Sequence, residues 1–236
     1  PSDFIFSSGI PLLKKSYLTN KSYLKRKTMS KLPSINRKHK ICVICEGAED
    51  RAYFERLCKL GVWNDAYDFK PVNAKSASNI PARYQNEFQN DSYELVLIFC
   101  DTDKEPYREY GQIKAKIDAF HGGSTPASQH MIIYANPCTM QIVLSHFGDV
   151  SLKNQGKKTN ADIIEKFTGV KNYDAHKEQI EEICSKIFRR TYPDMRSRVQ
   201  LLNHPDTVSG STNFIVFLEH FEEEKDGWIE EIRSHL

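Results

Sequence analysis

The stretch from Leu95 to Asp103 constrains the fold more than any other part of the sequence. Six consecutive apolar residues, 95–100, are rich in branched and aromatic side chains and predict a strand buried on both faces. Asp101, Thr102 and Asp103 follow at once. Residues i and i+2 of an extended chain point to the same side, so both carboxylates should leave the strand end together. Paired carboxylates suit a hard divalent cation, although the same residues also fit an ordinary aspartate-rich turn.

A second apolar run, 40–45, also ends in an acidic residue, because Glu46 and Gly47 follow it directly. The remaining patterns alternate between helix and strand up to residue 134. They predict helices over 50–61, 78–88 and 111–120 and strands over 69–72 and 131–134. This alternation is typical of an α/β fold, a Rossmann-like parallel sheet with right-handed crossovers and helices on both faces. Ligands bind such sheets at the carboxyl ends of the strands, so Glu46, Asp101 and Asp103 are expected to meet at one edge.

Beyond Asn136 the apolar spacing becomes helical. Helices are expected over 140–147, 159–168, 174–190 and 213–233, with breaks at 172–173, 192–193 and 203–205. We therefore expect three parts: a basic N-terminal arm (1–39), an α/β core (40–150) and a helical C-terminal extension packed on the core (151–236).

The charge is distributed unevenly along the chain. Residues 1–40 carry ten Lys or Arg and one acid, a net charge of +9, whereas residues 41–236 carry a net charge of −7. A basic arm on an acidic body is a common arrangement in proteins that bind a polyanion, although a solvated tail has the same composition. The arm residues expected to contact nucleic acid are Lys14, Lys15, Lys25, Arg26, Lys27, Arg37 and Lys38. Lys75 and Asn136 each follow a predicted strand and are further candidates for that contact.

No stretch approaches the roughly 18 apolar residues that would span a bilayer, and the first ten residues lack the pattern of a signal peptide. Most of the six cysteines lie within apolar runs, as is typical of reduced, buried thiols. Cys42 and Cys45 lack the second Cys or His pair that a zinc site would need. These features predict a cytoplasmic protein with no membrane partner.

The acidic cluster is a candidate metal site. Glu46, Asp101 and Asp103 offer the oxygen ligands that Mg²⁺ prefers, and Mn²⁺ takes the same ligands. A bound ion of this kind polarises a phosphodiester and lowers the pKa of a bound water. Glu46 either binds metal or moves a proton as a general acid or base. His146 lies in an apolar run and is either a core histidine or an active-site residue.

These motifs resemble the Toprim domain of topoisomerases, primases, and OLD-type and M5-type nucleases. The resemblance rests on Ile44-Cys45-Glu46-Gly47 with Tyr53-Phe54, and on Phe99-Cys100-Asp101-Thr102-Asp103. Within Toprim proteins the chain is most similar to the RloB-like family, through Asn136-Pro137-Cys138, His146-Phe147 and Ser211-Thr212-Asn213. The similarity spans roughly residues 40–220. It departs from the family pattern at Asp50-Arg51, where Thr-Glu is frequent, and at Thr139-Met140, where Phe-Glu is frequent.

The resemblance implies a metal-dependent nuclease that cleaves DNA or RNA, including tRNA as a substrate class, in bacterial defence against phage or mobile elements. It places Glu46, Asp101, Asp103 and His146 in the catalytic site. The loss of an acid at Met140 leaves an alternative open: a catalytically degenerate nucleic-acid-binding or regulatory module that works with an ATPase partner. A third hypothesis takes Asp101 as the nucleophile of a haloacid-dehalogenase-type phosphatase, but that family carries its Asp-x-Asp on the first strand.

Overall fold

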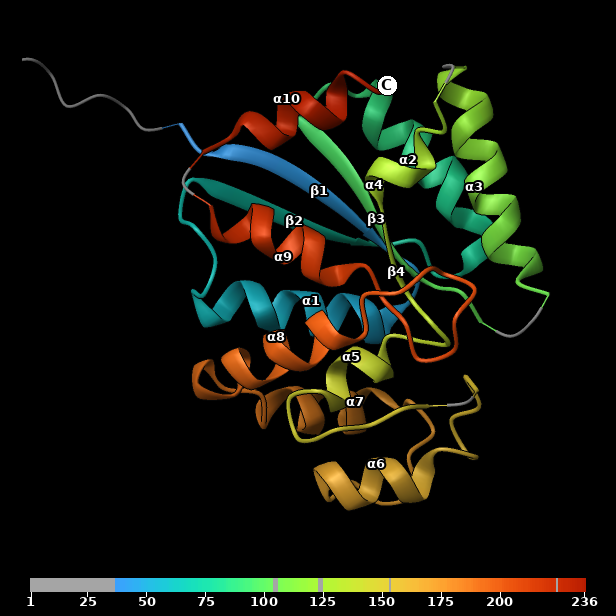
Figure 1. Ribbon diagram of the computed structural model, residues 1–236, viewed down its shortest axis with the longest axis vertical. Helices are drawn as coiled ribbons and strands as arrows, with labels where there is room; N and C mark the ends of the chain where they lie inside the picture. The colour runs from blue at the N-terminus through green and yellow to red at the C-terminus, as the bar shows by residue number, and fades with distance from the viewer. Residues whose placement is uncertain (1–36, 104–105, 123–124, 153, 224) are drawn as a thin grey trace, which may run out of the picture. The chain divides into compact units, whose positions relative to one another are not determined.

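Four parallel strands form the centre of the fold (Figure 1). The computed structural model describes residues 37–103, 106–122, 125–152, 154–223 and 225–236. The strands hydrogen-bond in the order β2-β1-β3-β4. Their bounds are β1 (His39–Cys45), β2 (Tyr67–Asn73), β3 (Leu95–Asp101) and β4 (Ile132–Ala135). Residues 95–100 of β3 are buried throughout, as the uninterrupted apolar run predicts.

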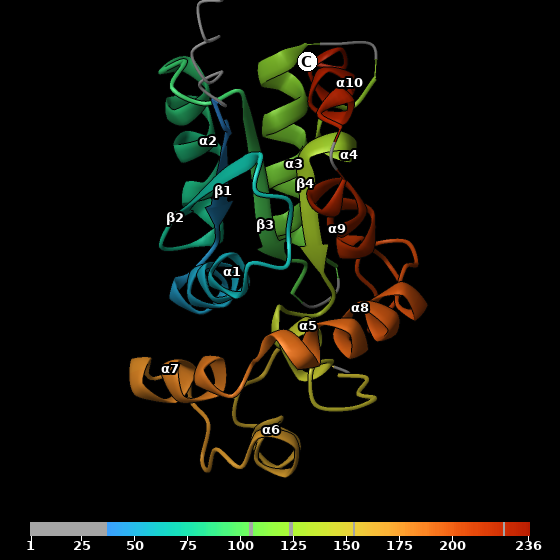
Figure 2. The same ribbon diagram turned by 90° about the vertical axis from the view of Figure 1, so that its left-hand side faces the viewer.

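Helices cover both faces of the sheet (Figures 1 and 2). One face is covered by α1 (Ala48–Leu60) and α9 (Phe214–Glu222), the other by α2 (Ile80–Gln89) and α3 (Arg108–His121). On the first face, the Phe54 ring of α1 lies 5.8 Å from Phe99 of β3 and 6.2 Å from Phe221 of α9. On the second, Tyr84 of α2 lies 6.1 Å from Phe120 of α3. The predicted two-sided α/β architecture is confirmed.

Short helices complete the chain, and most of them follow the sheet. They are η1 (Ala77–Asn79), α4 (Ser128–Met131), α5 (Met140–Leu144), α6 (Ala161–Thr168), α7 (Lys177–Ser185), η2 (Arg189–Thr191), α8 (Tyr192–Leu201) and α10 (Gly227–Arg233). The region beyond residue 136 is helical, as expected. Two details differ. The expected helix 213–233 is two helices, α9 and α10. Helix α8 begins where the sequence predicts a break, because Pro193 lies in its first turn, where a missing N–H costs no helical hydrogen bond.

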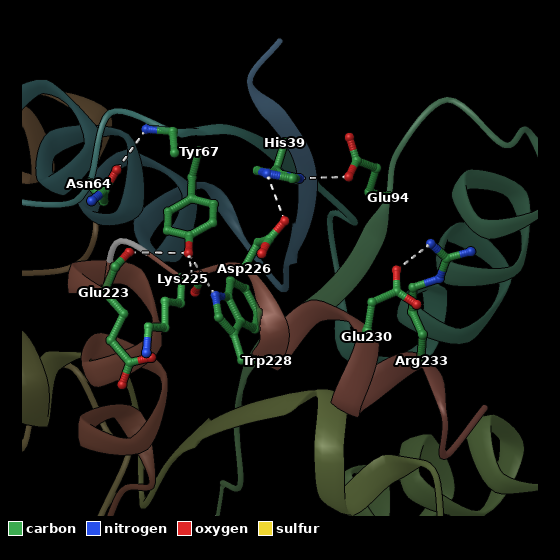
Figure 3. Close-up of polar contacts among 11 residues, drawn as sticks. His39, Asn64, Tyr67, Glu94, Glu223, Lys225, Asp226, Trp228, Glu230 and Arg233 are labelled. Carbon is green, nitrogen blue, oxygen red and sulfur yellow. Dashed lines mark hydrogen bonds and ion pairs between the residues drawn. The ribbon is translucent and has the colours of Figure 1, made fainter. Parts of the chain in front are cut away.

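Helix α10 is tied to the amino-terminal end of the sheet (Figure 3). Trp228 Nε1 donates to Tyr67 Oη at 2.9 Å, and that hydroxyl donates to the carbonyl of Lys225 at 2.9 Å. His39, the first residue of β1, lies 2.8 Å from Glu94 and 3.3 Å from Asp226. The starts of β1 and β2 are therefore held to the C-terminal helix, at the opposite end of the sheet from the carboxyl ends of the strands.

The outer edge of β4 is paired by the segment that precedes α9. The side chain of Asn213 accepts from Tyr134 N at 2.9 Å and donates to the carbonyl of Ile132 at 2.8 Å. Asn136 N donates to Ser211 O at 2.8 Å. These bonds satisfy an edge that would otherwise present unpaired backbone groups. Within the described chain, no helix is long and apolar enough to cross a membrane, and all six cysteines are free thiols.

Candidate acidic active site

A cavity of about 270 Å³ opens at the carboxyl ends of β1 and β3. Its floor is acidic. Glu46 follows β1, Asp101 ends β3, and Asp103 lies two residues further on; all three line the cavity, as the positions of the strands predict. Glu49 and Asp50, from the first turn of α1, line it as well. Five carboxyl groups therefore share one small space.

Backbone and hydroxyl donors hold two of these carboxylates. Glu46 continues the ladder of β1, because its N–H donates to Phe99 O at 3.1 Å, and its Oε2 accepts from Asp101 N at 3.2 Å. Asp101 Oδ1 accepts from both Thr139 N, at 2.7 Å, and Thr139 Oγ1, at 2.9 Å. Acids from two neighbouring strands are thus fixed side by side.

The geometry at Asp103 differs from the expectation. Its φ is +59°, in the left-handed region, and its N–H donates to Pro137 O at 3.1 Å. The strand ends at Asp101, so the rule that places residues i and i+2 on one side of an extended chain does not apply here. Aspartate tolerates the left-handed region better than most residues, and the turn still leaves Asp103 lining the cavity.

Burial and mutual repulsion make the cluster hard to ionise. Burial, followed by the charge of Asp50, raises the pKa of Glu46 to about 8. Burial also raises the pKa of Asp50 to about 6, with Glu49 contributing. The pKa of Asp101 is well above its ordinary value because of burial, then the charges of Asp50 and Glu46. A bound cation would relieve this cost directly.

The amino-terminal end of α1 faces the same cavity. Asp50 Oδ2 accepts from Gly47 N at 2.8 Å, which secures the first turn. Glu49 is held from the C-terminal region: Tyr173 Oη donates to it at 2.7 Å, and Lys157 Nζ lies 3.3 Å away. The helical extension therefore forms part of the site as well as covering the sheet.

Two lysines line the cavity with the acids. One is Lys75, which follows β2 and has a left-handed φ of +74° supported by a bond from its N–H to Asn73 Oδ1. The other is Lys157. Lys75 therefore lies beyond the carboxyl end of β2, as its position after a predicted strand implies. Asn136 does not line this cavity. It is 2% exposed, and its amide donates to Asp206 O at 2.7 Å.

The structure places His146 in the protein interior, away from the cavity lining. It is 3% exposed; Nε2 lies 3.1 Å from Tyr53 Oη and Nδ1 lies 3.0 Å from Thr191 Oγ1. Burial lowers the pKa of the ring to about 3. Both ring nitrogens have partners in the protein, so the contacts of His146 are those of a core histidine.

The predicted nucleic-acid-binding residues of the arm lie mostly beyond the part of the chain that the structure describes. Arg37 and Lys38 are exposed immediately before β1, at the amino-terminal end of the sheet and therefore at the opposite edge from the cavity. Lys14, Lys15, Lys25, Arg26 and Lys27 lie outside the described residues.

The donor set fits a magnesium-like ion of low protein coordination. Among the described residues, no three His, Cys, Asp or Glu side chains converge as a ready-made metal site. Mg²⁺ does not need one, because it keeps several waters and is usually held by one or two carboxylates together with substrate phosphates. Glu46 and Asp101, adjacent and difficult to ionise without a counter-charge, match that requirement.

Sequence patterns did not reveal several residues that shape this cavity. Thr139 donates to Asp101 through both its backbone N–H and its hydroxyl, and its sequence signal is limited to its place after Asn136-Pro137-Cys138. Lys157, Asn160 and Tyr173 come from a region with no chemical motif. They are brought to the site by tertiary packing.

Comparison with known proteins gave no identification: no family model, no curated protein and no solved structure matches the chain.

Proposed function

We propose that this protein is a Mg²⁺- or Mn²⁺-dependent nuclease of the Toprim type, related to RloB-like proteins, that cleaves phosphodiester bonds in DNA or RNA. The observation that carries the proposal is the pair of carboxylates, Glu46 and Asp101, presented by adjacent parallel strands at one cavity. Lysines in the same cavity suit the anionic oxygens of a phosphodiester. The motifs around the two acids, which resemble Toprim proteins, provide independent support.

Different residues would bind the metal ion and orient the phosphate. A bound divalent ion would supply Lewis-acid stabilisation and lower the pKa of a water. Asp101, oriented by Thr139, and Glu46 would be its ligands. Lys75 and the amino-terminal end of α1 would orient the phosphate, because helix N-termini favour anions. In the absence of metal, Glu46 holds a proton near neutral pH, since its pKa is about 8.

The test is cleavage with matched carboxylate variants. Plasmid, single-stranded DNA and total RNA, including tRNA, are incubated with Mg²⁺, Mn²⁺ or EDTA. We expect metal-dependent cleavage that Asp101→Asn and Glu46→Gln each reduce by at least about a hundredfold, because each removes a charge-stabilising ligand. Asp68→Asn, which alters an exposed acid of β2, is the control and should keep full activity. Equal activity in Asp101→Asn and the parent protein would refute the proposal.

A second candidate function is a non-catalytic nucleic-acid-binding module that works with an ATPase partner. Met140, where RloB-like proteins often carry an acid, lines the cavity and is 4% exposed, so that carboxylate is missing from the site. The two functions differ in their response to metal. A nuclease should melt at a higher temperature in Mg²⁺ than in EDTA, because a ligand that binds only the folded state stabilises it. The binding module should show no such shift while it retains affinity for nucleic acid.

A further inference from the structure

An exposed aromatic side chain surrounded by cations lies where α7 joins η2. Phe188 is 44% exposed, which is unusual for a large apolar residue. The guanidinium of Arg190 lies 5.1 Å from the centre of its ring, and that of Arg56, on α1, lies 6.0 Å from it. Both contacts are within the range of a cation–π interaction.

Further cations lie close to Phe188 in the sequence or on α1. Arg56 is fixed in place, because Nε and Nη2 both donate to Ile187 O, at 2.9 and 2.6 Å. Lys59 lies about one turn further along α1 than Arg56, and Arg189 directly precedes Arg190 in η2. Within the described chain, no ion pair involves Lys59, Arg189 or Arg190.

A groove that adjoins the acidic cavity lies along α1, the helix that also carries Arg56. A hollow of about 420 Å³ is lined by residues of both α1 and α7; in Figure 2, α7 lies below α1. Ala48, Ala175 and Ile180 line both this groove and the acidic cavity, so the two spaces adjoin. Ala48 lines the cavity and Arg56 contacts Phe188. Helix α1 extends by about 12 Å between these two residues.

The walls of the groove carry no net charge. Arg51 pairs with Glu55 at 2.7 Å, and Lys177 pairs with Glu181 at 3.6 Å. The groove therefore neither attracts nor repels a phosphate strongly, whereas Arg56 and Arg190 gather around Phe188.

We infer that the basic aromatic surface formed by Phe188, Arg56, Lys59, Arg189 and Arg190 binds single-stranded nucleic acid that extends along α1 from the cavity. The inference rests on the proposed function. An exposed phenyl ring offers a stacking face to any base, and guanidinium groups both stack on bases and bind phosphates. A single strand exposes its base faces, whereas a duplex keeps them stacked inside, so the surface favours unpaired DNA or RNA.

Binding is tested in the full chain carrying Asp101→Asn, so that a substrate survives the measurement. The probe is a fluorescein-labelled 12-nucleotide DNA or RNA of mixed sequence, compared with the same sequence as a hairpin duplex. Adding Phe188→Ala should weaken single-strand binding by about tenfold, the effect expected for loss of one stacked base. Adding Arg190→Ala should lower the slope of log K against log salt by about 0.7, because one phosphate contact is lost. Leu201→Ala, at an exposed apolar residue, and Lys116→Ala, at an exposed cation, are the matched controls.

A third variant reports on stacking itself. Phe188→Trp should retain affinity, and the added indole should be quenched when the oligonucleotide binds. Single-strand affinity that is absent in the parent, or unchanged by Phe188→Ala, would overturn the inference; unchanged affinity is also the result expected if the surface docks a protein. These outcomes are separate from the failure of the proposed function. Binding that depends on Phe188, together with no cleavage by the wild-type chain, would support the inferred binding surface and refute the proposed nuclease activity.

Discussion

At the scale of single residues, burial has different consequences for His146 and for the acids of the cavity. The acids of the cavity are difficult to ionise but adjoin a space that a cation can enter. His146 has no such space. Thr191 Oγ1 donates to Phe188 O at 2.9 Å, so the hydroxyl accepts from Nδ1, and Nε2 is left to accept from Tyr53 Oη. The ring is neutral in this arrangement, because Nε2 accepts a hydrogen bond and therefore carries no proton.

His146 should therefore make the fold sensitive to acid. Its folded-state pKa of about 3 lies below the ordinary value of 6.5, so the unfolded chain takes up a proton first as the pH falls. Stability contributed by the neutral ring is complete above pH 6.5 and is lost progressively towards pH 3. Between about pH 7 and pH 4 the free energy of unfolding of the wild-type protein should fall by about 3 kcal/mol relative to His146→Gln.

Urea denaturation of both proteins at a series of pH values measures this difference. Comparison with the variant cancels the opposite contribution of the acidic cavity, whose raised pKa values favour the folded state as the pH falls. His204→Gln, at an exposed histidine, should follow the wild-type curve. A constant difference between wild type and His146→Gln across this acidic range would show that the ring is already charged or solvated in the folded state.

At the scale of elements, the sequence predicted secondary structure best for the strands that are buried on both faces of the sheet. β1 and β3 are uninterrupted apolar runs, and the acids that follow them lie at the cavity where the sheet rule places them. α8 was not predicted, because a proline can either end a helix or begin one. Lys157 and Tyr173 could not be predicted as site residues, because only tertiary packing brings the extension over the first turn of α1.

The edge of β4 depends on one side chain for part of its pairing. Asn213→Ala would leave Tyr134 N and the carbonyl of Ile132 without these partners at buried positions. Buried unpaired backbone groups cost about 1–3 kcal/mol, so we expect a loss of roughly 2 kcal/mol in the free energy of unfolding. The exposed edge should also increase aggregation.

Chemical denaturation measures the first effect, and light scattering on heating measures the second. Asn203→Ala, at an exposed asparagine just beyond α8, is the matched control and should change neither. If Asn213→Ala were as stable as the control, another group or water would have to pair with the edge of β4.

At the scale of the whole molecule, charge is separated in a way that suits a long anionic substrate. Residues 41–236 carry a net charge of −7, and acids gather at the cavity, where phosphate alone would be repelled. Lys75 and Lys157 also line the cavity, other cations gather around Phe188, and the sequence of the first 40 residues is strongly basic. If the cavity takes a phosphate only together with a divalent ion, as the proposed function requires, substrate binding at the cavity should depend on metal.

The arm should then contribute affinity without sequence preference. Replacing Lys14, Lys15, Lys25, Arg26 and Lys27 with Gln in the full chain removes five positive charges. If all five contact phosphates, the slope of log K against log salt for single-stranded DNA should fall by about 3.5. Fluorescence anisotropy from about 50 to 300 mM salt measures this slope, with Lys116→Gln and Lys171→Gln as the exposed-lysine control. Because the arm would act on the backbone of the strand, random and homopolymer sequences should lose affinity equally. An unchanged slope would indicate that the arm serves another purpose, and that the cations around Phe188 provide the electrostatic attraction by themselves.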